Sequence, residues 1–320
     1  MSIGAPAGAL PATRRGAASC LAFGWVASLG ALVAPALAET KLSLPLDCDL
    51  GLTCDIQQYV DADPGPGIRD FTGGPLSYDG HQGTDIRVAD QEALADAPPV
   101  TAPADGTVLR VRDDVADGAF PQGQDCGNGL VLDHGDGLET QLCHLARGSI
   151  TVGPGEAVAR GQPVGRIGMT GRTEFPHVHL TVRRDGAVVD PFVEDLWQNA
   201  PDYAAGGLLS AGFASAVPDY DAIKAGTADA QVLAPSDPMV IWGHAFGTQA
   251  GDVLAMTIRL DDREVFAHEA TFERGQAQAF RAAGRRAPDG GWPAGTYGGE
   301  VALIRDGTEI ERTAVTVMVP

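Results

Sequence analysis

The chain has 320 residues, enough for two ordinary domains, and its 42 acidic and 22 basic residues give a formal net charge of −20. This charge argues against nucleic acid and anionic membrane surfaces as partners, because both present negative charge that the protein would repel. Hydrophobic residues make up 44% of the chain, and this composition is compatible with a folded, very soluble, secreted protein.

The first 38 residues have the features of a secretory signal peptide. Two arginines precede a mostly apolar stretch at 21–34, and Ala36-Leu37-Ala38 fits the small-x-small cleavage pattern. We expect cleavage before Glu39, with an uncleaved membrane anchor as the alternative. No later stretch of the sequence approaches the ~20 apolar residues that a membrane-spanning helix needs.

Residues 39–70 form a lead-in rich in Asp, Pro and Gly, and four cysteines follow the expected cleavage site. An even number of cysteines in an exported protein favours disulfides, for which three pairings are possible. We expect local pairing: Cys48 with Cys54 closes a small loop, and Cys126 with Cys143 joins two strands of an apparent hairpin. Zinc bound by cysteines is the competing interpretation, and these spacings suit it poorly.

From about 71 to 195 the sequence consists of short runs of β-type residues broken by Gly, Asp and Pro, a pattern that predicts a compact all-β domain. A stretch at 196–229 is rich in Ala and Gly and is expected to be a linker with a short helix near 221–224. The clearest strand candidates in the first domain are 106–112, 129–133, 157–159 and 177–182.

A second β-rich segment spans 230–320, and its last hairpin turns at Asp306-Gly307. About seven strands in a segment of this length predict a sandwich of immunoglobulin-like type. Trp242 and Trp292 are expected in its core rather than on a binding surface. The strand candidates are 239–242, 253–260, 299–305 and 313–319.

Two histidines lie on one face of a predicted strand. Side chains alternate along a strand, so His177 and His179 project together while Val178, Leu180 and Val182 form the buried face. A single histidine in this position would more often be a surface residue. Two imidazoles on one face, beside a glycine-rich loop, are candidate metal ligands.

A second pair, in His81-Gln82-Gly83-Thr84-Asp85, lies where a loop enters a strand. Mixed His and Asp ligation suits zinc, although alone this pair could be a turn with solvated polar residues. His144, after Cys143, adds a fifth candidate. A catalytic zinc takes three protein ligands, so five candidates leave two histidines to handle protons.

Taken in order, these motifs resemble the M23, or lysostaphin-like, zinc endopeptidases, which cut peptide bridges in bacterial peptidoglycan. The resemblance covers about 77–192 and implies an all-β catalytic domain with an open groove over a sheet. Thr181 departs from it, because many relatives have Glu there, and so does the expected cysteine bridge near His144. The matching elements are residues 81–86, 102–108, 127–137, 144–145, 161–165, 168–171 and 176–179.

The resemblance also implies a role for each candidate. His81, Asp85 and His179 would bind one Zn²⁺ ion, and His144 and His177 would be the catalytic pair. One of the pair would accept or orient the proton of the attacking water, and the other would stabilise the oxyanion and help protonate the leaving amine. The sequence does not assign which does which.

We therefore expect a zinc-dependent endopeptidase acting on stem or cross-bridge peptides of peptidoglycan, located in the periplasm or, as second choice, secreted. After cleavage of the leader it would have no membrane association. The alternatives are a silent relative that binds peptidoglycan or activates another hydrolase, and a secreted protease acting on Gly-rich proteins. His134, His244 and His268 are expected to have no catalytic role.

Overall fold

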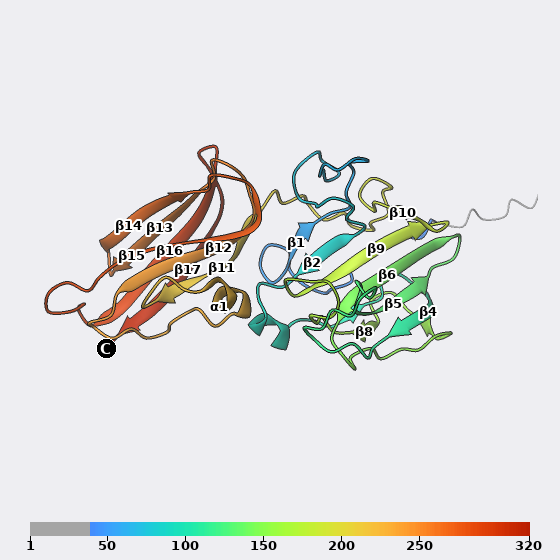
Figure 1. Cartoon of the computed structure of the whole chain (residues 1–320), viewed down its shortest axis with the longest axis horizontal. Helices are drawn as coiled ribbons and strands as arrows, with labels where there is room; N and C mark the ends of the chain where they lie inside the picture. The colour runs from blue at the N-terminus through green and yellow to red at the C-terminus, as the bar shows by residue number, and fades with distance from the viewer. Residues whose placement is uncertain (1–38) are drawn as a thin grey trace, which may run out of the picture. The chain divides into compact units, whose positions relative to one another are not determined.

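The computed structural model describes residues 39–320, so the expected signal peptide at 1–38 lies outside the described residues. Two β-rich regions follow one another along the chain, as predicted (Figure 1). The α-helix α1 (Tyr220–Ala225) falls where the short helix was expected. No helix within 39–320 combines the length and the apolar character required to cross a membrane.

The first region is built on an eight-stranded antiparallel sheet of order β1-β2-β9-β6-β5-β4-β7, with β10 paired to β9. Two further strands, β3 (Val100–Thr101) and β8 (Pro163–Gly165), pair separately, and a 3-10 helix spans Glu92–Ala95. The strands of the large sheet are β1 (Asp55–Gln58), β2 (Thr84–Arg87), β4 (Gly106–Arg112), β5 (Asn128–Asp133), β6 (Leu138–Leu145), β7 (Ala157–Val158), β9 (His177–Arg184) and β10 (Ala187–Val189).

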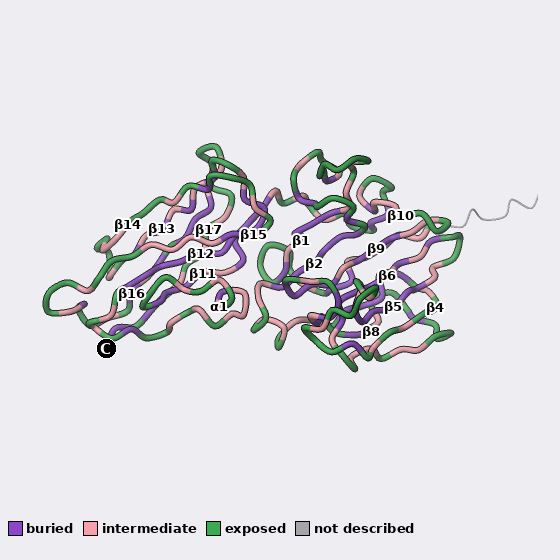
Figure 2. The backbone as a smooth tube through the Cα atoms, viewed as in Figure 1, coloured by how far each residue is buried: buried purple, intermediate pink, exposed green. Residues whose placement is uncertain are grey.

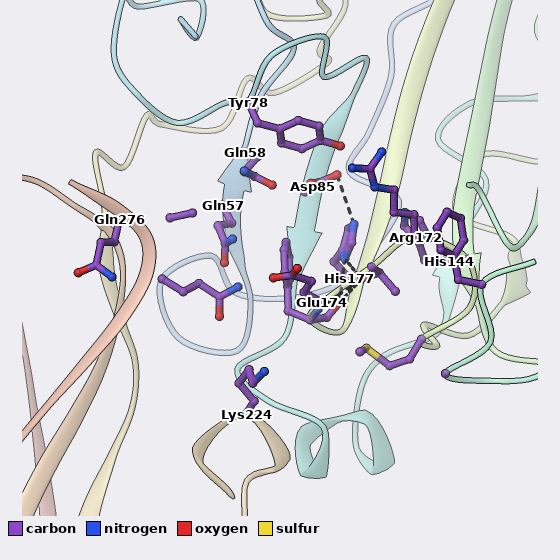
Figure 3. Close-up of a pocket in the computed structure, with 18 of the residues that line it drawn as sticks. Gln57, Gln58, Tyr78, Asp85, His144, Arg172, Glu174, His177, Lys224 and Gln276 are labelled. Carbon is purple, nitrogen blue, oxygen red and sulfur yellow. Dashed lines mark hydrogen bonds and ion pairs between the residues drawn. The ribbon is translucent and has the colours of Figure 1, made fainter. Parts of the chain in front are cut away.

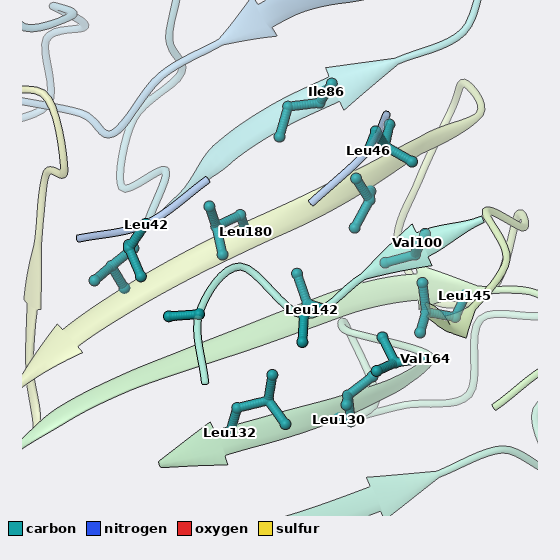
Figure 4. Packing of buried hydrophobic residues seen from close by; sticks show 14 of the residues in the cluster. Leu42, Leu46, Ile86, Val100, Leu130, Leu132, Leu142, Leu145, Val164 and Leu180 are labelled. Atoms are coloured by element: carbon teal, nitrogen blue, oxygen red, sulfur yellow. The ribbon is translucent and has the colours of Figure 1, made fainter. Parts of the chain in front are cut away.

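Alternation along β9 separates a core face from a polar face. Val178, Leu180 and Val182 have no exposed surface, which confirms the predicted buried face. His177 and His179 therefore lie on the opposite face, away from the hydrophobic cluster. Figure 2 shows the burial running along β2, β9 and β6. Figure 4 shows part of the cluster, with Leu42, Leu46, Ile86, Val100, Leu130, Leu132, Leu142, Leu145, Val164 and Leu180 labelled.

The predicted hairpin and both predicted disulfides are present. β5 and β6 pair from Asp133 with Glu139 onward, on either side of the turn at 134–137. Cys48 is bonded to Cys54, and Cys126 to Cys143. The four sulfur atoms are thereby used, which removes the cysteine-ligated zinc from consideration.

Segments that the sequence suggested were a lead-in and a linker also contribute to the sheets. β1, within 39–70, is an edge strand paired with β2, and Leu42 and Leu46 are buried in the first core. β11 (Gly207–Ala214), within 196–229, pairs with β12. These strands carry few β-branched residues, so composition alone gave little sign of them.

The second region is a sandwich of seven strands in two sheets, β11-β12-β15 and β14-β13-β16-β17. Phe213 and Ile241 from one sheet share a buried cluster with Leu254 and Tyr297 from the other. β14, the fourth strand of this region, pairs with β13, the third. In constant-type immunoglobulin domains the fourth strand instead lies in the same sheet as the first, second and fifth strands. The remaining bounds are β12 (Met239–Thr248), β13 (Val253–Leu260), β14 (Arg263–Thr271), β15 (Gln276–Arg285), β16 (Gly295–Arg305) and β17 (Thr308–Val319).

Both tryptophans considered in the second region are buried, at 3% exposed for Trp242 and 6% for Trp292. Trp292 Nε1 donates a hydrogen bond to the carbonyl oxygen of Asp237 at 2.8 Å. The prediction that they are core residues is confirmed.

Candidate metal centre

His81 lies in the loop that enters β2 and Asp85 lies within β2, and both are 2% exposed. Gly83 lies between them, where a Cβ atom would come within 2.5 Å of His179 Nε2 and 2.7 Å of the Leu180 carbonyl oxygen. Only glycine allows the chain to pass this close to β9. Antiparallel pairing then places Asp85 directly opposite His179.

Three donor atoms converge at this point. Asp85 Oδ1 lies 3.2 Å from His81 Nε2 and 2.7 Å from His179 Nδ1, and the two nitrogens are 3.3 Å apart. Around a tetrahedral zinc ion with bonds of about 2.0–2.1 Å, ligand atoms are about 3.3 Å apart. Two of the three distances match this value, the Asp85–His179 distance is shorter, and the donor types of the three residues suit zinc.

Each of the two imidazoles is fixed through its other nitrogen. His81 Nδ1 donates a hydrogen bond to the carbonyl oxygen of Tyr59 at 2.7 Å, which directs Nε2 toward Asp85. His179 Nε2 is 2.9 Å from Thr181 Oγ1, which leaves Nδ1 facing Asp85. Such partners commonly orient metal-binding histidines. Thr181, a departure from the family pattern, here holds His179.

The other two predicted residues lie beside this point. His177 Nδ1 donates a hydrogen bond to the Phe175 carbonyl at 2.9 Å, and its Nε2 is 3.4 Å from Asp85 Oδ1. His144 Nδ1 donates to the Thr170 carbonyl at 2.8 Å. The imidazole centres of His144 and His177 are 4.6 Å apart. The structure thus brings all five residues together, and Figure 3 shows three of them at one edge of a hollow.

A buried polar network that sequence reasoning missed holds His144. This residue has a positive φ of 65°, and its N–H donates to the Cys126 carbonyl at 2.9 Å. Thr170, whose carbonyl binds the imidazole, accepts a hydrogen bond from Asn128 N–H and donates one to the Leu145 carbonyl, both at 2.9 Å. Thr170 and Asn128 are fully buried. The only sign of this network in the sequence was Asn128, a polar residue between two glycines at the start of an apolar strand.

The electrostatics favour a charged Asp85, while the imidazoles respond differently: burial lowers the pKa of His81, but the charge of Asp85 and its hydrogen bond outweigh burial and raise it. Burial raises the pKa of Asp85, but the charges of His177 and His81 and hydrogen bonds from His177 and His179 outweigh it, so the pKa lies well below its usual value. Burial, reinforced by repulsion from His177 and His179, lowers the pKa of His144 to about 3. Burial also lowers the pKa of His179. A metal ion needs an ionised carboxylate and neutral imidazoles as ligands, which matches the directions of the pKa shifts at Asp85 and His179.

A hollow of about 790 Å³ opens at this edge of the five-residue cluster. Tyr78 stands at its rim, 49% exposed, with its ring centre 4.4 Å from that of His81. Apolar, aromatic and charged side chains all reach the hollow. They include Asp85, Phe120, His144, Met169, Arg172, Glu174, His177 and Lys224.

The remaining histidines lie elsewhere. His134 is hydrogen-bonded to the Asp105 carbonyl and to Thr140 Oγ1, both at 2.8 Å, so its imidazole joins the loop before β4 to β6. Within residues 39–320, the two His/Asp groups with metal-like spacing include neither His244 nor His268. Those groups are His81, Asp85 and His179, and His144, His177 and His179.

Comparison with known proteins supports the resemblance seen in the sequence. Residues 79–191 match the family model of Peptidase family M23. The peptidoglycan DD-endopeptidases ShyB and ShyA of Vibrio cholerae serotype O1 are 34% and 35% identical over 116 and 99 residues, covering 36% and 31% of this chain. The chain spans less than a quarter of either relative, 23% and 19%. A solved zinc-containing peptidase from Vibrio cholerae is 28% identical, with 42% of this chain and 38% of that one covered at a TM-score of 0.29.

Proposed function

Because residues 79–191 belong to peptidase family M23, we propose that the protein is a zinc-dependent endopeptidase that hydrolyses peptide bonds of bacterial peptidoglycan. The observation that carries this proposal is the convergence of three zinc-type donors with two further imidazoles beside a hollow. A silent peptidoglycan-binding relative would have no need to keep all five side chains in this arrangement.

We assign His81, Asp85 and His179 as the ligands of one Zn²⁺ ion. A bound zinc ion would polarise the scissile carbonyl and lower the pKa of a water molecule. The other group, His144, His177 and His179, offers no carboxylate. It would also occupy both imidazoles that proton transfer needs, so we favour the first set.

His144 and His177 would then manage the proton. His144 donates its Nδ1–H to a backbone carbonyl, so its Nε2 remains as the acceptor, whereas Nε2 of His177 faces Asp85 at 3.4 Å. A neutral imidazole at this position can take the proton of the attacking water as oxygen adds to the carbonyl carbon. The proton passes to the amine nitrogen when the C–N bond breaks, which completes the hydrolysis.

The relatives' names support the choice of bond and compartment. ShyA and ShyB are DD-endopeptidases, so we propose that this protein also cuts a bond between D-configured centres in a direct cross-link. Peptidoglycan lies outside the cytoplasm, and the two disulfides suit an oxidising compartment. We propose export to the periplasm, with secretion as the second possibility.

Mass spectrometry of peptidoglycan incubated with the zinc-loaded mature protein and with His179→Ala tests the function. We expect cleaved stem peptides from the unchanged protein alone. His268→Ala, which removes an exposed histidine of β14, is the matched control and should yield the same products. Tight zinc binding without any product would instead support a binding or regulatory role.

A further inference from the structure

The hollow beside the metal centre contains an arginine without a partner. Among the residues that the structure describes, the exposed side chain of Arg172 makes no hydrogen bond or ion pair. Its backbone is nevertheless fixed: Arg172 N–H donates to the Asp125 carbonyl at 2.8 Å, and Gly171 N–H donates to the Ala119 carbonyl at 2.9 Å. The guanidinium of Arg172 therefore lies at the hollow on a backbone that is held by hydrogen bonds.

The other charges in the hollow do not neutralise it. Lys224 is paired with Asp221 at 3.0 Å, and Asp85 is surrounded by imidazoles. Glu174 lines the hollow but forms no ion pair with Arg172. A guanidinium without a counter-ion beside the five-residue cluster can bind an anionic group of a ligand that enters the hollow.

Arg172 acts on the metal side of the hollow. Its charge is among the influences on the Tyr78 hydroxyl, and the Tyr78 ring contacts that of His81 at a tilt of 32°. Figure 3 shows the guanidinium directed toward Tyr78, next to the His177–Asp85 pair. A zinc ion held by one carboxylate keeps a net positive charge, so a ligand here faces two positive groups together.

We propose that Arg172 determines specificity by binding a free carboxylate carried next to the scissile amide. This inference rests on the proposed function and narrows its substrate class. In a direct cross-link, the nitrogen of the scissile amide belongs to a diamino dicarboxylic acid. The carbon atom bonded to that nitrogen also carries a free carboxylate. An internal bond of a glycine bridge has no charge at that position.

The chemistry of the side chains fits this choice. A guanidinium binds a carboxylate through two parallel N–H···O bonds, which fixes its orientation as well as its charge. Phe120, 53% exposed, and Met169 line the same hollow and offer apolar surface to a small side chain such as that of D-alanine. A glycine bridge would use neither feature.

The test uses two synthetic cross-linked peptides that differ only in that carboxylate, free in one and a neutral carboxamide in the other. We expect the zinc-loaded protein to favour the free acid by roughly 10- to 100-fold in kcat/KM, the range expected for a charged hydrogen-bonded pair. Arg172→Gln should cleave both peptides at the lower rate. Lys224→Gln, which removes a paired cation from the same hollow, should keep the preference.

A preference that survives in Arg172→Gln, or no preference in the unchanged protein, would overturn the proposal while leaving the endopeptidase intact. If neither peptide is cleaved, the proposed cleavage of direct cross-links fails, and calorimetry with the metal-free protein still decides the role of Arg172. The free-acid peptide should then bind more tightly than the carboxamide, and only when Arg172 is present. Equal binding of the two peptides would refute the assignment.

Discussion

Each β region buries an aspartate, but the two carboxylates are neutralised differently. Asp252 in the second region is 1% exposed and forms a two-pronged pair with Arg305, at 2.9 and 2.8 Å. Asp85 in the first region is as deeply buried but has only imidazoles around it. The charge of Asp252 is neutralised by Arg305, whereas the charge of Asp85 can still be neutralised by a bound cation.

The two regions also differ in how they bury histidine. His244 has no exposed surface, and its Nδ1 has no hydrogen-bond partner in the part of the chain that the structure describes. Burial, helped by the positive charges of Arg87 and Lys224, lowers its pKa to about 3. Burial and a shifted pKa therefore do not by themselves mark a site. What marks a site is the convergence of several metal-binding donor atoms, as at His81 and His179.

Replacing the two aspartates separately sharpens this comparison most. Asp85→Asn keeps the shape of the side chain but removes the anionic ligand, so we expect zinc content to fall and turnover to drop by roughly a thousandfold or more. Asp252→Asn leaves the half-buried Arg305 without its counter-ion, so we expect roughly 2–4 kcal/mol less stability. Zinc analysis, turnover and urea unfolding measure both variants. Comparable turnover losses in folded samples of the two would contradict the distinction.

The disulfides, both in the first region, provide the second test. Removing the Cys126–Cys143 bridge by a double Ser replacement frees a loop with a sequence separation of 17, and should cost about 3 kcal/mol of stability. The Cys48–Cys54 bridge has a separation of 6 and should cost less, about 2 kcal/mol. Only the first loss should also slow turnover, because His144 follows Cys143. Urea unfolding and turnover of the two double variants provide the check.

A smaller effect is expected at Thr170. Its carbonyl oxygen accepts the hydrogen bond from His144, and its hydroxyl group fixes Thr170 through hydrogen bonds with Asn128 and Leu145. Thr170→Val keeps the volume and loses both hydroxyl hydrogen bonds, so kcat should fall roughly 10- to 100-fold with KM and zinc affinity little changed. Thr170→Ser should restore most of kcat. A loss shared equally by the Val and Ser variants would show that the methyl group, not the hydroxyl, matters.

The smallest effect near neutral pH concerns acid stability and His244. Its pKa is about 3 in the folded protein and near 6.5 when unfolded, so between these values the unfolded state binds more protons. Stability should therefore fall as the pH decreases below 6.5, by up to roughly 1.4 kcal/mol per pH unit from this residue. His244→Leu should remove that part of the slope and leave the stability at pH 7 little changed. Urea unfolding at several pH values measures the stability of both proteins. If the stability of His244→Leu depends on pH as steeply as that of the unchanged protein, the assignment to His244 is refuted.

Much of the first region could be predicted from periodicity. His177 and His179 were identifiable because residues two apart share a strand face, and the buried valines confirm that face. Asn128 and Thr170 could not be found this way, since their partners are backbone carbonyls far away in the sequence. The metal-binding and catalytic roles of the five residues stay predictions.

The second region was predicted as a sandwich from the number of its strands. Its hairpin at 306–307 was visible because Asp-Gly is a strong turn signal. The pairing of β14 with β13 was not, because strand choice between two sheets depends on packing rather than on local pattern. Arg172 was missed for another reason: an exposed arginine has no signature until its surroundings are known.

Gly83 has a consequence for how such a protein can be modified. Any side chain there would displace the His179 ring and turn its Nδ1 away from Asp85, so the loop from 80 to 84 and the strand beneath it can change only together. Arg172 and Phe120 lie at exposed positions and can be exchanged singly. Engineering of new substrate preferences can therefore proceed at the rim by single replacements, while grafts from other proteins must transfer the histidine loop and its partner strand as one piece.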